Sequence, residues 1–227
     1  RQFDLVWARA WSRDFGGGLW WTTARREKNT CVNAPAVIAA VKLYQSSGDR
    51  SYLTRAKRLY AWLRTTLFDP GTGALDDHVY RGAAGGKHEV EGRDRSRYTY
   101  NQGTFIGAAE ALYETTGSAS YRSDARAALD FTVADLTTDG VLDSEGSGGD
   151  GGGFKGIFAR WAAMFVTSAG LSSYEPWLQL NEHVAWSDRD RRGLVWEDWD
   201  APTLPGRLYS FDCSSAAVLL QVAPPAR

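Results

Sequence analysis

Residues 41–56, VKLYQSSGDRSYLTRA, and residues 110–125, EALYETTGSASYRSDA, are two copies of one pattern. In each copy a Leu-Tyr pair closes one apolar stripe at helical spacing, a glycine follows, and a Tyr and an Ala begin a second stripe. Such spacing is typical of amphipathic helices, and glycine favours a helix end. The pattern therefore predicts repeated helical hairpins, which bury their apolar faces by packing side by side in an open solenoid or a closed ring.

The same periodicity continues along the chain and predicts an all-α fold. Asn33 and Pro35 stand where an N-cap and a first-turn proline belong, ahead of a stripe that Gly48 ends. Strand alternation is confined to short pieces near residues 19–21 and 194–196. Further helices are predicted at about residues 52–63, 106–113, 121–129, 154–166, 174–184 and 211–222. For a chain of 227 residues we expect a single domain over residues 1–227.

Three long, polar, glycine-rich stretches separate the predicted helices, at residues 13–21, 71–100 and 140–153. They recur at equivalent points, after the second helix of one hairpin and before the next. This placement predicts that all three lie at the same end of the helices. Loops gathered at one rim of a rigid scaffold are where binding and catalytic sites are built.

Composition narrows the class of partner. The 26 Lys plus Arg against 27 Asp plus Glu give no electrostatic reason to expect a nucleic acid or an anionic membrane. No apolar run is long enough to cross a bilayer. Cys31 and Cys213 allow at most one bridge, and two inert buried thiols are the favoured interpretation. Ten Trp and ten Tyr fit either a large aromatic core or an aromatic-lined cleft that stacks on sugar rings.

The stretch GGGLWW opens one rim loop and ends in Trp20 and Trp21. Its three glycines permit unusual backbone angles and close approach of a ligand, and the paired Trp offers a stacking surface. The alternative is a turn followed by two core aromatics. Asn29, a few residues on, is suited to hydrogen-bond a sugar or to cap the next helix.

The stretch YNQG, residues 100–103, stands at a predicted helix start. Asn101 and Gln102 each offer a donor and an acceptor, which suits them to vicinal hydroxyl groups, with Tyr100 beside them. The alternative is an Asn cap with buried Tyr neighbours. A third stretch holds Asp150, Phe154 and Lys155 around a glycine run. It lacks the preceding strand and the Lys-Ser/Thr pair of a phosphate-binding loop, so a nucleotide site is not expected.

Asp76 and Asp77 form the only adjacent carboxylate pair in a loop of this kind. Glycoside hydrolysis needs two carboxyl groups around the scissile bond, so both are candidate catalytic residues. Substrate binding by one of the two, or simple turn carboxylates, are stronger alternatives. His78, His88 and His183 lack metal-ligand spacing, so no metal site is expected.

Taken as a set, GGGLWW, KNTCVN, YNQG with LYETTG, and GDGGGFKGIFARW resemble glycoside hydrolase family 76 from about residue 10 to residue 222. The resemblance implies an (α/α)6-type barrel of helical hairpins that acts on α-1,6-linked mannan, with some relatives acting as transglycosylases. It implies a retaining mechanism with two Asp residues and no cofactor. It further implies a secreted or cell-surface protein, whose signal segment does not lie in this chain.

In the family, an adjacent Asp-Asp pair at the start of a Trp-rich helix precedes the glycine triple. This chain begins after that point, so we expect a barrel incomplete at its N-terminal side and a domain without its catalytic pair. The resemblance assigns substrate binding to Asp77, with Asp76 as the alternative. Three hypotheses remain open: a mannan hydrolase domain, inactive as it stands; a non-catalytic carbohydrate-binding or transglycosylase-like protein; and a protein-interaction solenoid.

Overall fold

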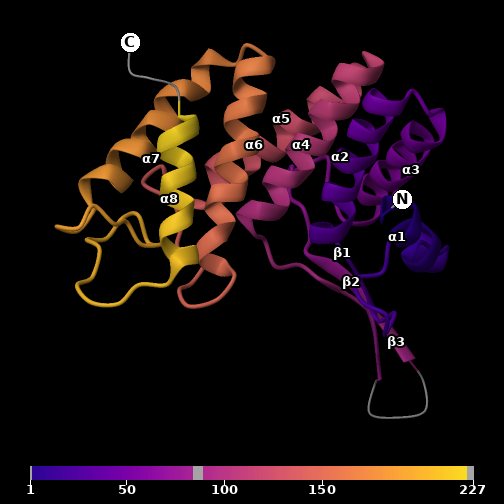
Figure 1. Cartoon of the computed structure of the whole chain (residues 1–227), viewed down its shortest axis with the longest axis horizontal. Coiled ribbons are helices and arrows are strands. Elements are labelled where there is room, and N and C mark those ends of the chain that lie inside the picture. Colours follow the sequence, from indigo (N-terminus) through magenta and orange to yellow (C-terminus); the bar gives the residue numbers. More distant parts are fainter. Residues whose placement is uncertain (1, 84–88, 224–227) are drawn as a thin grey trace. The chain divides into compact units, whose positions relative to one another are not determined.

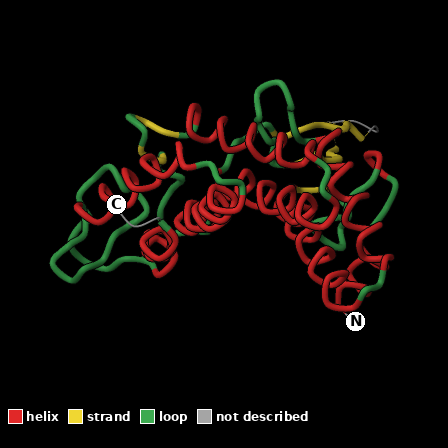
Figure 2. The backbone as a smooth tube through the Cα atoms, turned by 90° about the horizontal axis from the view of Figure 1, so that it is seen from above, coloured by secondary structure: helices red, strands yellow, loops and turns green. Residues whose placement is uncertain are grey.

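The computed structural model describes residues 2–83 and 89–223, and within them helices dominate (Figures 1 and 2). The α-helices are α1 (Gln2–Ala10), α2 (Thr30–Ser47), α3 (Arg50–Thr66), α4 (Thr99–Thr116), α5 (Ala119–Asp135), α6 (Phe154–Ser168), α7 (Glu175–Ser187) and α8 (Ser210–Val222). The strands are β1 (Glu27–Asn29), β2 (His78–Ala83), β3 (Glu89–Asp94), β4 (Thr137–Thr138) and β5 (Val141–Leu142). Short 3-10 turns are η1 (Asp14–Gly16), η2 (Gly151–Gly153) and η3 (Ser172–Tyr174).

The chain divides into two compact units. The first comprises residues 1–97 and 107–128, and the second comprises residues 98–106 and 129–227. Helices α4 and α5 contribute residues to both units. The single domain over residues 1–227 stays a prediction.

The repeated hairpin pattern is confirmed in the first unit. Helix α2 ends at Gly48, whose φ of 72° is left-handed and whose N–H bonds to Tyr44 O at 2.8 Å. Asp49 then caps α3 by accepting the Ser51 N–H at 2.8 Å. Gly117 ends α4 in the same way, with a φ of 71°. Glycine adopts this conformation without the strain that a side chain brings, so the two glycines of the repeat mark its turns.

The region between residues 71 and 100, expected to be loop, contains two strands. Strand β2 pairs antiparallel with both β1 and β3 (Figure 1). In the sequence, the apolar residues of β2 and β3 are Val79, Val90, one tyrosine and one alanine. Apolar and polar residues therefore alternate only weakly in these segments. The short alternating piece at residues 194–196 does not form a strand, and the one at residues 19–21 forms only a single bridge, between Trp11 and Leu19.

The helix expected to begin near Asn33 begins earlier, at Thr30, so Asn33 is not its N-cap. The Thr30 N–H donates to the Asp77 carbonyl oxygen, and the Thr30 hydroxyl donates to the Asp76 carbonyl oxygen. These two hydrogen bonds hold the start of the helix directly after β1. The Asn33 side chain instead accepts the Leu19 N–H at 2.7 Å and donates to Leu19 O at 3.1 Å. It therefore fixes the segment that carries the tryptophans.

In the second unit, glycines allow close helix packing. A Cβ added at Gly103 of α4 would lie 2.5 Å from Phe158 Cα in α6. A Cβ at Gly156 of α6 would lie 2.8 Å from Ser215 Cα in α8. The N-terminal turns of α4, α6 and α8 therefore lie together at one end of this unit.

Cys31 and Cys213 are not joined in a disulfide, and both are half-buried. Cys31 lies in α2 and Cys213 in α8. Within the described ranges, no helix combines the length and the apolar character that crossing a membrane requires.

Candidate functional site

The glycine triple is shaped by a tryptophan beneath it. Gly16, Gly17 and Gly18 have φ values of 80°, 148° and 85°. A Cβ at Gly18 would lie 2.8 Å from the Trp62 ring, and Trp62 Nε1 donates to Phe15 O at 2.9 Å. At Gly18 only glycine fits both the backbone angle and this close approach, so this position of the triple has a packing reason that does not require a ligand.

Lys28 holds the glycine loop from the other side. Its side chain is fully buried, and Nζ donates to Gly17 O at 2.6 Å, Asp14 O at 2.7 Å and Ser12 Oγ at 2.8 Å. Nζ also lies 4.5 Å from the centre of the Trp20 ring. Burial lowers the pKa of Lys28 to about 8. Lys28 therefore holds the glycine loop in place and does not present a charge at the surface.

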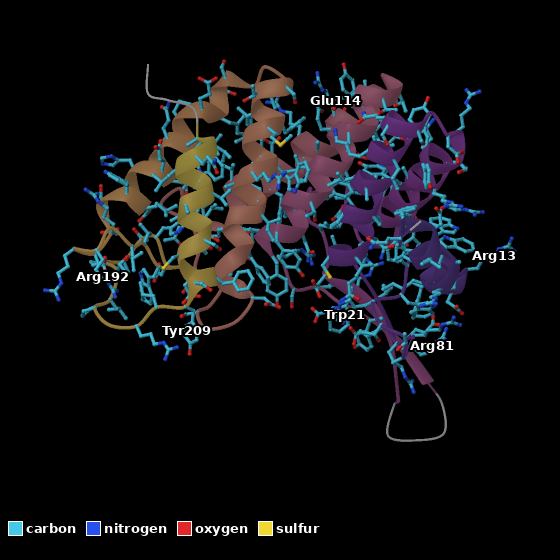
Figure 3. The ribbon with its side chains drawn as sticks, in the orientation of Figure 1. Arg13, Trp21, Arg81, Glu114, Arg192 and Tyr209 are labelled. Atoms are coloured by element: carbon cyan, nitrogen blue, oxygen red, sulfur yellow. The ribbon has the colours of Figure 1, made fainter. Side chains whose placement is uncertain are left out.

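The two neighbouring tryptophans differ in exposure. Trp20 is 4% exposed and belongs to the core, whereas Trp21 is 54% exposed and lies beside the sheet (Figure 3). The Trp20 N–H bonds to Ala10 O and the Trp21 N–H to Glu27 O. Of the pair, only Trp21 exposes its ring, and its role as a stacking surface stays a prediction.

One face of the three-stranded sheet collects polar and aromatic groups. His78 stands at the start of the middle strand, with Asn29 opposite it in β1 and Asp94 opposite it in β3. Tyr80, two residues along, is exposed and its ring lies over Gly92, where a Cβ would be 2.5 Å from Tyr80 Cζ. The glycine thus leaves room for the ring to lie flat on the sheet.

The two adjacent aspartates have different environments. Asp76 is buried and forms ion pairs with Arg93, at 3.0 Å, and with Arg97. Asp77 is half-buried, and its Oδ2 lies 2.7 Å from His78 Nδ1. The carboxylate of Asp76 is committed to two arginines, which suits an anchor of the β3–α4 connection better than a nucleophile.

In the second unit, aromatic rings surround the glycine run. The Phe154 ring lies 5.5 Å from that of Tyr98 and 4.1 Å from that of Tyr100. Tyr209 and Phe211 are among the most exposed large side chains, and Tyr209 lies beside the first turn of α8 (Figure 3). This end of the unit offers several ring faces to a ligand.

Glu145 ties the loop before the glycine run to the start of α4. Its carboxylate accepts the Thr99 N–H at 2.8 Å and the Thr99 hydroxyl. Burial raises the pKa of Glu145 to about 7, against the opposing effects of the Thr99 hydrogen bonds and of Lys155. A carboxylate at this position satisfies a backbone donor of the first helical turn.

Three of the predicted contact residues are fully buried. Asn101 and Gln102 have no exposed surface, and Lys155 is 1% exposed with Nζ 4.5 Å from the Trp199 ring centre. Burial lowers the pKa of Lys155 to about 8. Their role in sugar binding stays a prediction, and burial favours a supporting role for them. Asp150, by contrast, is exposed.

The predicted site residues thus fall into two groups. Trp20, Trp21, Asn29, Asp76 and Asp77 lie in the first unit. Those of the second unit are Tyr100, Asn101, Gln102, Asp150, Phe154 and Lys155. A common mouth for both groups stays a prediction.

The sequence interpretation missed several side chains that adjoin these groups. His78 was set aside as a scattered histidine, although its position directly after Asp77 was a usable signal. Glu145 and Tyr209 follow no motif, and only the fold brings them to the glycine run. Among the residues that the structure describes, no cluster of His, Cys, Asp and Glu suits a metal ion, and His88 lies outside them.

The sequence profile of Glycosyl hydrolase family 76 matches residues 1–212. The chain belongs to glycoside hydrolase family 76. This confirms the resemblance that the four motifs carry, and it gives the mostly helical chain the α/α-barrel fold class of that family.

Three similar proteins illustrate the family. A mannan endo-1,6-alpha-mannosidase of Candida glabrata is 26% identical over 219 residues, 87% of this chain and 48% of the relative. The solved α-1,6-mannanase GH76A of Salegentibacter sp. HEL1_6 is 33% identical with a TM-score of 0.86, covering 97% of this chain and 67% of that one. Its inactive variant, with two adjacent aspartates changed to asparagine and α-1,6-mannotriose bound, is 34% identical with a TM-score of 0.86 and the same coverage. The chain spans about half the length of this curated relative.

Proposed function

We propose that this chain is an α-1,6-mannan-hydrolysing glycoside hydrolase domain. The observation that carries the proposal is the match of 97% of the chain, at 34% identity, to a mannanase that holds α-1,6-mannotriose. The ligand class comes from that relative. The side chains described above supply the independent physical support.

Each unit offers the groups that sugar binding needs. In the first unit, Trp21 and Tyr80 present exposed rings, and Tyr80 lies beside His78, which contacts the half-buried carboxylate of Asp77. In the second unit, Tyr100 and Phe154 form a partly exposed aromatic pair. Planar rings bury the C–H faces of pyranoses, and neighbouring polar groups pair with the hydroxyl groups.

The proposed substrate also indicates where the protein acts. An enzyme for a polymeric mannan meets its substrate at a cell surface or outside the cell, so we place the protein there. The substrate is a chain of α-1,6-linked mannose units, and neither a nucleic acid nor a cofactor takes part.

Turnover is tested by incubating the protein with α-1,6-mannan and measuring new reducing ends, with a β-1,4-mannan as the matched control. No side chain of this chain is assigned as the nucleophile or the acid/base, so the prediction concerns linkage: any new reducing ends come from the α-1,6 polymer alone. Analysis of the products by chromatography separates hydrolysis from transfer, because transfer yields oligosaccharides longer than the starting ones. Equal rates on both polymers contradict a mannan hydrolase. So does the absence of new reducing ends when the protein still binds the α-1,6 polymer.

A second candidate function is binding of α-1,6-mannan without cleavage. It is favoured by the two ion pairs of Asp76, because they leave the Asp76–Asp77 pair without two carboxylates available to a substrate. Saturable binding of mannan oligosaccharides with no new reducing ends over long incubation is the result that selects this function.

A further inference from the structure

The Asp77–His78 pair is a built feature of the sheet. Asp77 Oδ2 lies 2.7 Å from His78 Nδ1, and the two side chains are 13% and 17% exposed. His78 is the first residue of β2, the middle strand, so its backbone is fixed on both sides. A carboxylate on Nδ1 selects the tautomer that carries its proton there, and this leaves Nε2 as the acceptor in the neutral ring.

Nε2 has no hydrogen-bond partner among residues 2–83 and 89–223, although the ring is mostly buried. The groups that face the ring are Asp77, Asp94 across the strand, and the ring of Tyr80 at 5.7 Å. Hydrogen bonds from Ser96 lower the pKa of Asp94, and the charge of a protonated His78 adds to this effect. Polar nitrogen and an exposed ring thus stand side by side.

Asn29 gives a second, independent observation on the same face. It is 5% exposed, it pairs with His78 across the strands, and its Oδ1 has no hydrogen-bond partner within the described part of the chain. A buried amide oxygen without a partner is costly, and an ordered water or another polar group commonly supplies the missing donor. A hydroxyl group, the commonest donor of a sugar, satisfies Nε2, whereas Asn29 Oδ1 is enclosed by the protein and does not reach a ligand.

We propose that His78, oriented by Asp77, binds a hydroxyl group of α-1,6-linked mannose through Nε2, with Tyr80 flanking the pyranose. This rests on the proposed function and extends it by naming a contact residue that none of the motifs contains. Asp77 is the positioning residue of the pair.

Two substitutions separate the roles of the two ring nitrogens. In H78N the amide nitrogen takes the place of Nδ1, so the bond to Asp77 is kept and Nε2 is lost. In H78Q the amide reaches the place of Nε2, so the ligand contact is kept and the orientation by Asp77 is lost. The matched control is H183N, because His183 is an exposed histidine of α7.

The measurement is calorimetric titration with α-1,6-mannotriose. We expect H78N to weaken binding about tenfold, which corresponds to one lost hydrogen bond, H78Q to weaken it less, and H183N to leave it unchanged. Binding that H78N leaves unchanged overturns the inference alone. No binding by the unaltered chain overturns the proposed function and the inference together.

An NMR measurement on the unaltered chain covers the case in which H78N does not fold. The ¹⁵N shifts of the His78 ring report its tautomer and the hydrogen bonding of each nitrogen. We expect the Nδ1–H tautomer and a change of the Nε2 shift on addition of mannotriose. The opposite tautomer overturns the inference. So does an Nε2 shift that stays constant on addition of mannotriose while the Trp21 indole signal changes.

Discussion

Lys28 and Lys155 are both buried lysines that lie 4.5 Å from the centre of a tryptophan ring. Neither is a surface contact for a ligand. Each belongs to a motif on which the family resemblance rests, KNTCVN for Lys28 and FKGI for Lys155. Each motif is explained, in large part, by the carbonyl oxygens and rings around its lysine.

Replacing Lys28 by methionine tests this structural role. The change leaves Gly17 O, Asp14 O and Ser12 Oγ without their donor, so we expect K28M to lower the free energy of unfolding by about 1–3 kcal/mol in urea titration. The control is K42M, at an exposed position of α2. A K28M protein as stable as K42M contradicts the role.

Glu145 predicts how stability depends on pH. Burial raises its pKa from 4.5 to about 7 in the folded state, so between these values the folded chain binds more protons than the unfolded chain. Its contribution to the free energy of unfolding therefore falls as pH rises through this window, by about 3 kcal/mol in all. Urea titrations at pH 5 and pH 7.5 measure it.

The variant E145Q removes the titration and flattens this part of the stability profile. E114Q, at an exposed position of α4, is the control and leaves the profile unchanged. If E145Q keeps the slope of the unaltered chain, the burial of the Glu145 carboxyl does not have the assigned effect.

Residue identity alone did not distinguish neighbours that the fold separates. Trp20 and Trp21 were predicted together as a stacking surface, yet the extended backbone between them turns one into the core and the other outward. Asp76 and Asp77 differ in the same way, because Arg93 and Arg97 are brought to Asp76 by strand pairing. Such contacts join residues distant in sequence, and no local pattern contains them.

Among the elements, α2 to α8 were predictable, whereas α1 and the sheet were not. Apolar spacing and the turn glycines Gly48 and Gly117 are local signals, and the predicted helices are present. Strand β1 has three residues, and β2 gains its partners only when residues 27–29 and 89–94 meet. Register between strands is a non-local property, and apolar and polar side chains alternate too weakly in β2 to predict it.

Gly103, of the motif YNQG, is predicted to be a packing residue of α4. An alanine Cβ there would lie 2.5 Å from the backbone of Phe158, so the helices must separate. We expect G103A to lower the free energy of unfolding by about 1–3 kcal/mol, although alanine is the better helix former. Thermal unfolding measures it. The control is G149A, at a loop position with open space; equal stabilities of the two variants contradict the packing role.

For the whole molecule, a single domain predicts a single cooperative unfolding transition. Helices α4 and α5 contribute residues to both compact units, so unfolding of either unit disrupts a helix of the other. We expect calorimetry to show one transition, with the van 't Hoff enthalpy equal to the calorimetric enthalpy. Two resolved transitions contradict the single domain.

Family membership and fold class follow from motifs spread over the whole chain, whereas the arrangement of the ligand-binding groups does not. The central claim is that these groups recognise α-1,6-linked mannose. Calorimetric titration of the unaltered chain with α-1,6-mannotriose, and with maltotriose as a control of equal size, tests it most directly. The account predicts saturable binding of mannotriose and none of maltotriose; no binding of mannotriose, or equal binding of both, contradicts it.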